Sequence, residues 1–409
     1  MSFTRRSLIG TAAAAAVATR PSGVRAQGNP LIRIGVLNDQ SGPFRDFGGM
    51  GSVAAVRQAV KDFGDQGFPM EVIFADHQNK PDVGAAIARQ WCDTGDVDML
   101  IDLPNSAVAL AVNQIVREKN KVMITSAAAT MELTGPQCSP NTVQWTFDSY
   151  MLAKAQGVAM TKAGGKTWFL LYADFTYGQQ MARDITRFVT AEGGKMLGTA
   201  AYPVVGTTDF SSFLLEAQAS GAKVLSFTSG GSDAVNIIKQ AREFGLPATM
   251  QIAALLMFIA DVHALGLEQA QGIVLCSPFY WDLNDRTRAF TKRFLRDQSP
   301  PTYPSMDSAG CYAGALHYLK AVTAMGVAKA KADGTATVSQ MKAIPTDDDA
   351  YGSGSIREDG RTITPAYLFQ VKTPSESKAP WDYYRLLQTL PANQIWRPLS
   401  EGNCSLIKR

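Results

Sequence analysis

The first stretch whose residue types could do chemistry is a glycine pattern near the start of the chain. Gly49-Met50-Gly51-Ser52-Val53-Ala54 matches GxGxxA, which binds the pyrophosphate of a dinucleotide, and Asp76 lies where a ribose-binding acid would be expected. The glycines of that fingerprint must lie in the tight turn directly after a strand, but the first expected strand ends well before them, near Asn38. We therefore expect no dinucleotide and no other cofactor.

The remaining reactive residues do not indicate metal ligation or catalysis. His77, His263 and His317 lie far apart without HxxxH spacing, so core or solvated histidines are expected. The acidic run Asp347-Asp348-Asp349 lies in a polar loop without EF-hand spacing. No GxSxG nucleophile turn and no GxxxxGK[ST] phosphate loop occur in the sequence. The sequence therefore predicts a chain that is not an enzyme, with no catalytic residue and no metal site.

Polar residues follow three of the expected strands and favour a binding site. Residues 39–48 follow the first strand, Pro104-Asn105-Ser106 the third, and residues 126–130 the fourth. Asn105 or Ser106 can cap the helix that follows, and the free backbone N–H groups at its start favour a carboxylate or another oxyanion. About half of such residues are only caps and turns. Three such loops at one edge of a sheet nevertheless favour a ligand site.

These loops are positioned by two repeats of the same alternation of strands and helices. Short apolar runs begin near residues 32, 70, 99 and 122 and again near 167, 195, 223 and 250, with amphipathic segments between them. Because such runs are typical of buried parallel strands, the sequence predicts an α/β fold with two doubly wound parallel-sheet lobes. Ligands of open α/β sheets bind beyond the carboxyl ends of the strands, which here would face a cleft between the lobes.

The rest of the chain is too short for a third domain, so we expect it to complete the two lobes. The chain would then cross between the lobes more than once and form a hinge, with crossings near residues 146–150, 278–281 and 350–355. The predicted division assigns residues 27–147 plus 281–350 to lobe 1, and residues 148–280 plus 351–409 to lobe 2 and the C-terminal tail.

Residues 1–26 have the features of an export signal. Arg5 and Arg6 precede an apolar run, and Val24-Arg25-Ala26 presents small residues at the positions that a signal peptidase reads. The run is shorter than the roughly 20 residues of a membrane span, and the arginine pair also fits the twin-arginine pattern. We expect cleavage after Ala26 and export to the periplasm. The mature chain would keep 35 basic residues against 36 acidic ones, which argues against nucleic acid as a partner.

Several of these segments together resemble the type 1 periplasmic solute-binding proteins of the leucine/isoleucine/valine-binding group. The segments are residues 31–48 with their SGP motif, SAAATMELT at 126–134, DFTYG at 174–178 and IKQAREFG at 238–245. FYWDLNDRTRAF at 279–290 and REDGR at 357–361 look like a branch associated with aromatic or other organic acids. The resemblance covers nearly the whole mature chain. It implies a monomeric receptor that binds a small solute between two lobes and delivers it to the membrane permease of an ABC transporter.

The resemblance also implies roles for individual residues. Carried over by position, the residues that hold the ligand's carboxylate would be Asn105, Ser106, Ser126, Ala128 and Thr130. Phe47, Tyr177 and the loop Gly230-Gly231 fall on further contact positions. Tyr280 offers a ring face to the ligand, although that ring could equally pack in the hinge.

One departure from the family concerns the ammonium group of an amino-acid ligand. The position that supplies an acid to it falls at about Leu255, and no acid lies between Gly245 and Asp261. Because a buried ammonium without a paired charge is costly, we predict a small organic carboxylate, aromatic rather than aliphatic. Asp174 could still reach an ammonium, so a branched-chain or other amino acid remains the alternative. A ligand-sensing receptor subunit is a further one.

Cysteine use predicts one covalent link. The five cysteines lie far apart and contain no CxxC, and an oxidising compartment permits disulfides. Cys138 and Cys404 both lie in polar segments near glycine and proline, so we predict that these two form a disulfide.

Overall fold

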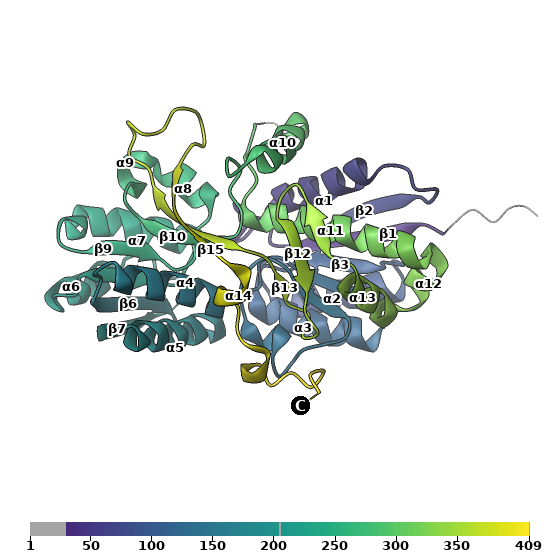
Figure 1. Cartoon of the computed structure of the whole chain (residues 1–409), viewed down its shortest axis with the longest axis horizontal. Helices are drawn as coiled ribbons and strands as arrows, with labels where there is room; N and C mark the ends of the chain where they lie inside the picture. The colour runs from purple at the N-terminus through teal and green to yellow at the C-terminus, as the bar shows by residue number, and fades with distance from the viewer. Residues whose placement is uncertain (1–29, 204–205, 299, 409) are drawn as a thin grey trace, which may run out of the picture.

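Apolar runs alternate with amphipathic segments along the chain, and in space they form two separate sheets. The computed structural model describes residues 30–203, 206–298 and 300–408, and Figure 1 shows two lobes arranged along the long axis. Each lobe has helices on both faces of a wholly or mainly parallel sheet, which confirms the predicted fold class. The predicted export segment lies outside the described residues.

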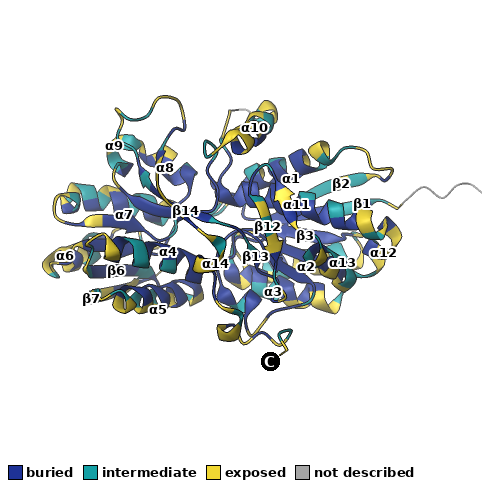
Figure 2. Ribbon diagram, in the orientation of Figure 1, coloured by how far each residue is buried: buried dark blue, intermediate teal, exposed yellow. Residues whose placement is uncertain are grey.

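The first lobe is built on a parallel sheet with the strand order β2-β1-β3-β4-β5. Its strands are β1 (Ile32–Asn38), β2 (Met70–Asp76), β3 (Met99–Asp102), β4 (Val122–Thr125) and β5 (Thr142–Gln144). Helices α1 (Gly49–Phe63), α2 (Pro81–Asp93) and α3 (Ser106–Glu118) connect the first four strands. Successive side chains of a strand point to opposite faces, so Leu100 packs with α2 and α3 while Ile101 packs on the side of α1. Figure 2 shows the central strands as buried.

The second lobe is built on a larger sheet with the order β15-β14-β10-β9-β8-β6-β7. Its parallel strands are β6 (Thr167–Ala173), β7 (Lys195–Tyr202), β8 (Val224–Phe227), β9 (Gln251–Ala254) and β10 (Val274–Ser277). The late strands β14 (Ala366–Val371) and β15 (Tyr384–Leu390) add to it in antiparallel fashion. Helices α4 (Ser149–Lys162) and α5 (Thr176–Ala191) cover one face, and α6 (Ser211–Ala219), α7 (Ser232–Glu243), α8 (Ile259–Leu265) and α9 (Leu267–Ala270) the other.

The chain after the second set of parallel strands returns to the first lobe. Helix α11 (Met306–Met325) packs along α1 and against β3, and α13 (Gly334–Ala343) packs on α11 and β4. Helix α10 (Asp285–Phe294) also contacts α1, and α12 (Val327–Ala332) joins α11 to α13. A small antiparallel sheet of β11 (Thr346–Asp348), β12 (Gly352–Ile356) and β13 (Thr362–Ile363) follows, near the junction of the lobes in Figure 1. The residue limits given above for each lobe stay a prediction.

Arg361, from the REDGR segment, ties the crossing segments together at the junction. Its side chain is fully buried and donates hydrogen bonds to the carbonyls of Trp145 and Phe147, at 2.6 and 3.0 Å. The guanidinium also lies 4.2 Å from the ring centroid of Trp396. Burial lowers the pKa of Arg361 to about 10, so the group still carries its charge at neutral pH.

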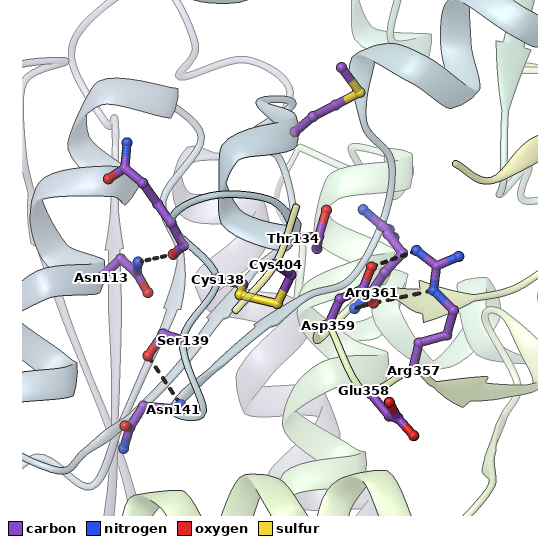
Figure 3. Close-up of a disulfide and its surroundings, with 12 residues drawn as sticks. Asn113, Thr134, Cys138, Ser139, Asn141, Arg357, Glu358, Asp359, Arg361 and Cys404 are labelled. Carbon is purple, nitrogen blue, oxygen red and sulfur yellow. Dashed lines mark hydrogen bonds and ion pairs between the residues drawn. A yellow bond between two sulfur atoms is a disulfide. The ribbon is translucent and has the colours of Figure 1, made fainter. Parts of the chain in front are cut away.

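The C-terminal tail crosses back to the first lobe and is anchored there by a disulfide. Helix α14 (Ala392–Ile395) packs on α4, and the chain then runs to Cys404, which is bonded to Cys138 (Figure 3). The Cα atoms of the two residues are 5.6 Å apart. The predicted pairing is therefore confirmed. The other three cysteines, Cys92, Cys276 and Cys311, are free.

Candidate functional site

The carboxyl ends of strands from both lobes surround a cavity of about 120 Å³. Loops after β1, β3 and β4 form one side, and loops after β6, β8 and β9 form the other. The lining residues are Pro43, Phe44, Phe47, Pro104, Asn105, Ser106, Ala127 and Ala129 from the first lobe, and Phe175, Tyr177, Ser229, Gly230, Ser232, Asp233, Leu256 and Phe258 from the second. A wider groove along α1 and α11 is lined by arginines that already pair with aspartates, so the interlobe cavity is the candidate site.

The loop after β1 brings aromatic rings into the cavity. Asp39 is fully buried at the end of this strand, and its carboxylate accepts hydrogen bonds from the backbone N–H groups of Gly42 and Phe44, at 2.8 and 3.0 Å. The turn held in this way presents Phe44 and Phe47, as the resemblance implied for Phe47. Phe47 stacks on Phe258 of the second lobe, with ring centroids 3.8 Å apart. This stack joins the two lobes across the site.

The turn after β3 presents the start of a helix to the cavity. Asp102 and Leu103 both have positive φ angles, of 91° and 59°, and the turn ends at Asn105. Asn105 caps α3 by accepting hydrogen bonds from the N–H groups of Ala107 and Val108. Ser106 is the first residue of this helix. Asn105 and Ser106 therefore both line the cavity, where the helix N-terminus favours a ligand carboxylate.

The loop after β4 bends at Ser126 and Ala127, and only some of its residues reach the cavity. Ala127 and Ala129 line the cavity, whereas the three implied residues Ser126, Ala128 and Thr130 do not. The Ser126 hydroxyl donates to Asp102 and the Ala128 carbonyl accepts from Gln144. The Thr130 hydroxyl donates to Gln180 and caps a 3₁₀ turn. These three residues hold the loop in place.

On the second lobe Tyr177 and Gly230 line the cavity, and their contact with a ligand stays a prediction. The Tyr177 hydroxyl donates a hydrogen bond of 2.9 Å to the carbonyl of Thr228, and burial raises the pKa of this phenol well above its usual value. Helix α5 can begin here because Gly178 has no Cβ, which would lie 1.9 Å from the carbonyl of Ala173.

Gly231 follows the lining residue Gly230 and lies close to the backbone of the first lobe. Its φ of 72° is in the region that favours glycine, and its N–H donates to the buried carboxylate of Asp261. A Cβ at this position would lie 2.9 Å from the carbonyl oxygen of Pro43 in the first lobe. Gly231 therefore permits the closed arrangement without lining the cavity itself.

The last two candidate residues lie away from the cavity. Leu255 is buried in the core and its neighbour Leu256 takes the lining position. Tyr280 packs against Phe369 and Tyr384, and its hydroxyl donates to the carbonyl of Trp381. The packing alternative for Tyr280 is therefore the one seen in the structure.

Asp233 is a site residue that the sequence reasoning missed. It lies in the first turn of α7, directly after Gly230-Gly231-Ser232, and it is the one charged residue among those that line the cavity in the described chain. Burial raises its pKa to about 6, against the opposing effect of the nearby hydroxyls of Tyr202 and Ser232. Asp174, which we considered as an ammonium partner, is exposed and accepts a hydrogen bond from Gln179.

Among the described residues, no helix combines the length and the apolar character that crossing a membrane requires.

Comparisons with known proteins agree on the type of fold. Residues 31–378 match the family model described as periplasmic binding protein. A periplasmic binding protein from Burkholderia mallei is 44% identical, with a TM-score of 0.86 over 92% of this chain and 99% of that one. A branched chain amino acid ABC transporter periplasmic ligand-binding protein from Burkholderia xenovorans is 40% identical, with a TM-score of 0.83 over the same shares.

More distant structures share the fold alone. A solute-binding protein from Rhodopseudomonas palustris in complex with benzoate is 21% identical, with a TM-score of 0.78 over 89% of this chain and 97% of that one. A comparison with curated proteins gives no match.

Proposed function

The chain belongs to the periplasmic binding protein family, and we propose that it captures a small apolar α-amino acid for import by an ABC transporter. It is a binding protein rather than an enzyme. In this proposal the cavity between the lobes holds the ligand in the periplasm, and the closed form docks on a membrane permease.

This proposal rests on one observation: one side of the cavity favours a negatively charged ligand group and the other side favours a positively charged one. The start of α3, with Ser106, favours a carboxylate on the first-lobe side, and Asp233 favours a cation on the second-lobe side. The rings and aliphatic side chains between them suit an apolar body. An α-amino acid with an apolar side chain has all three features.

The size of the cavity supports a small ligand. An apolar cavity of about 150 Å³ in another protein accepts benzene, so a volume of about 120 Å³ suits one branched aliphatic chain or one small ring. The 40% identical relative, described as a branched chain amino acid binder, supports the aliphatic choice.

A small aromatic carboxylate is the second candidate, and the rings of Phe44, Phe47 and Phe175 favour it. Relatives near 20% identity hold benzoate and 4-hydroxybenzoate. Asp233 opposes this ligand, because no described lining residue carries a positive charge and the Asp233 carboxylate would repel a second carboxylate.

Calorimetry with matched ligands tests the choice. Leucine, 4-methylpentanoate and benzoate separate the contribution of the ammonium from that of the apolar body, since 4-methylpentanoate is leucine without its amino group. We expect leucine to bind and 4-methylpentanoate to bind about 30-fold or more weakly, because it leaves Asp233 unpaired. Tighter binding of benzoate than of leucine would establish the second candidate instead. Binding of no small solute at all would contradict the receptor function.

A further inference from the structure

Two aspartates that are 205 positions apart in sequence meet in the core of the first lobe. Asp102 ends β3 and Asp307 lies in the first turn of α11, and both side chains have no exposed surface. One oxygen of each carboxyl group lies within 4.8 Å of the other and of the Cys311 sulfur. Two ionised carboxylates at this separation in a dry core would repel each other strongly.

The partners of the two carboxyl groups are unequal. Asp102 accepts hydrogen bonds from the Asn38 amide at 2.9 Å and from the Ser126 hydroxyl at 3.3 Å. The Ser126 hydroxyl also lies beside Asp307, but neither Asp307 oxygen accepts a well-formed hydrogen bond from a described residue. A proton on Asp307, donated to Asp102, would satisfy the pair and remove one of the two charges.

Among the described residues that act on the two carboxyl groups, none carries a positive charge. The titratable groups that face the pair from the surrounding elements of the described chain are the Cys311 thiol on α11 and the Tyr351 phenol after β11. The groups from α1, β1 and β4 are neutral, namely Ser52, Asn38 and Ser126. Burial and mutual repulsion raise the pKa of Asp307 well above its usual value, consistent with one retained proton.

The pair also connects the loops that form the first-lobe side of the cavity. Asp102 binds the ends of β1 and β4 through Asn38 and Ser126, and its own strand leads into the turn at Asn105. On the other side, Ser305 caps α11 next to Asp307 and donates a hydrogen bond of 2.5 Å to the carbonyl of Phe47. A Cβ on Gly48 would lie 2.7 Å from an Asp307 oxygen, so the loop and the pair are in direct contact.

We propose that Asp102 and Asp307 share a single proton and act as positioning residues that hold the three first-lobe loops of the ligand cavity in register. The shared proton does not depend on the proposed function. Its expected effect on ligand affinity rests on that function. Loss of the proton places two like charges in the core, and the hydrogen bonds from Asn38 and Ser126 to Asp102 must then rearrange.

Infrared spectroscopy of the whole protein at pH 8 tests the shared proton without any ligand. The other aspartates with raised pKa values, such as Asp184 and Asp348, have values of about 6 and are ionised at pH 8. We expect a carbonyl band of a protonated carboxylic acid in the native protein, lost in Asp307→Asn and kept in the surface control Asp285→Asn. Absence of the band from the native protein would overturn the proposal. So would a stoichiometric metal found by elemental analysis, since a cation would then neutralise the pair.

Unfolding and binding measurements test the consequences. Unfolded Asp307 loses its proton near its ordinary pKa of 3.8 while the folded form keeps it, so stability falls as pH rises. Relative to Asp307→Asn, the unfolding equilibrium constant should rise up to about tenfold per pH unit between pH 5 and 8. Asp307→Asn, whose amide can still donate to Asp102, should keep leucine affinity within about threefold, while Asp307→Leu should lose tenfold or more. If Asp307→Leu bound leucine as tightly as the native protein does, Asp307 would have no positioning role. If the native protein binds no amino acid, the proposed function fails. The infrared band still shows whether Asp102 and Asp307 share a proton.

Discussion

Replacing Asp233 by asparagine tests how the cavity selects its ligand. The substitution keeps the shape of the side chain and removes the negative charge that we propose pairs with the ligand's ammonium. Removing one partner of a buried charge pair costs about 2–5 kcal/mol. Asp233 is only partly buried, so solvent screening places the expected loss near 2–3 kcal/mol, at the lower end. That corresponds to leucine affinity roughly 30- to 150-fold weaker.

The pH dependence of binding provides a second measure of the same interaction. The pKa of Asp233 in the free protein is about 6, and a bound ammonium would hold the carboxylate ionised to lower pH. Leucine affinity should therefore be full above pH 7 and fall as pH drops below 6, by up to about tenfold per unit. Benzoate should show the opposite trend, because it binds better when Asp233 is protonated. Asp233→Asn should abolish both trends.

Calorimetry on the native protein, Asp233→Asn and Asp174→Asn between pH 5 and 8 measures both effects. Asp174 is a suitable control because it is an exposed aspartate on the neighbouring loop of the same lobe and does not line the cavity. Unchanged leucine affinity in Asp233→Asn, or a leucine affinity that is flat from pH 8 to pH 5, would refute the ammonium pairing. The sequence-based choice of an aromatic carboxylate would then regain support.

Three further predictions concern closure and stability. Gly231→Ala should weaken leucine binding at least tenfold, because its Cβ would meet a first-lobe carbonyl, while Gly245→Ala, with a similar φ of 68° and open space around it, should bind normally. Equal affinities of the two variants would contradict this. The Cys138→Ser/Cys404→Ser double variant should lose about 2–4 kcal/mol of unfolding free energy in urea, and an unchanged midpoint would show that the link is unimportant. Arg361→Met should cost about 3–5 kcal/mol of unfolding free energy, because it leaves buried carbonyls and a nearby aspartate unpaired. A loss below about 1 kcal/mol would show that Arg361 does not stabilise the junction of the lobes.

The strands of both lobes could be predicted because their signal is local. The eight expected starts lie within one residue of the observed ones, for example 99 for β3 and 223 against 224 for β8. An apolar run buried on both faces can be recognised without knowing its neighbours. Strand β5 has only three residues and no apolar run, and the expected strands did not include β10 or β15. β5 and β15 each pair with the strand that precedes them, and β10 pairs both with its predecessor β9 and with the distant strand β14.

Prediction of the site was less complete, for reasons that differ between residues. Asn105 and Tyr177 could be found because a helix start after a strand faces the cleft in any doubly wound lobe. The side chains of the loop after β4 that reach the cavity could not be predicted, because the loop bends directly after the strand and has no regular period. Asp233 escaped notice because an acid in the first turn of a helix commonly serves only to favour the helix dipole.

The sequence by itself determined the two-lobed α/β class, the loops that could reach a ligand and the pair of cysteines suited to a disulfide. These follow from residue type and periodicity, which are properties of short segments. Only the tertiary structure decided which side chain of each loop faces the cavity, and that Asp102 meets Asp307 across 205 residues of chain. Such contacts depend on how helices and sheets pack at long range, because the free energy of a charge is set by the groups around it in space.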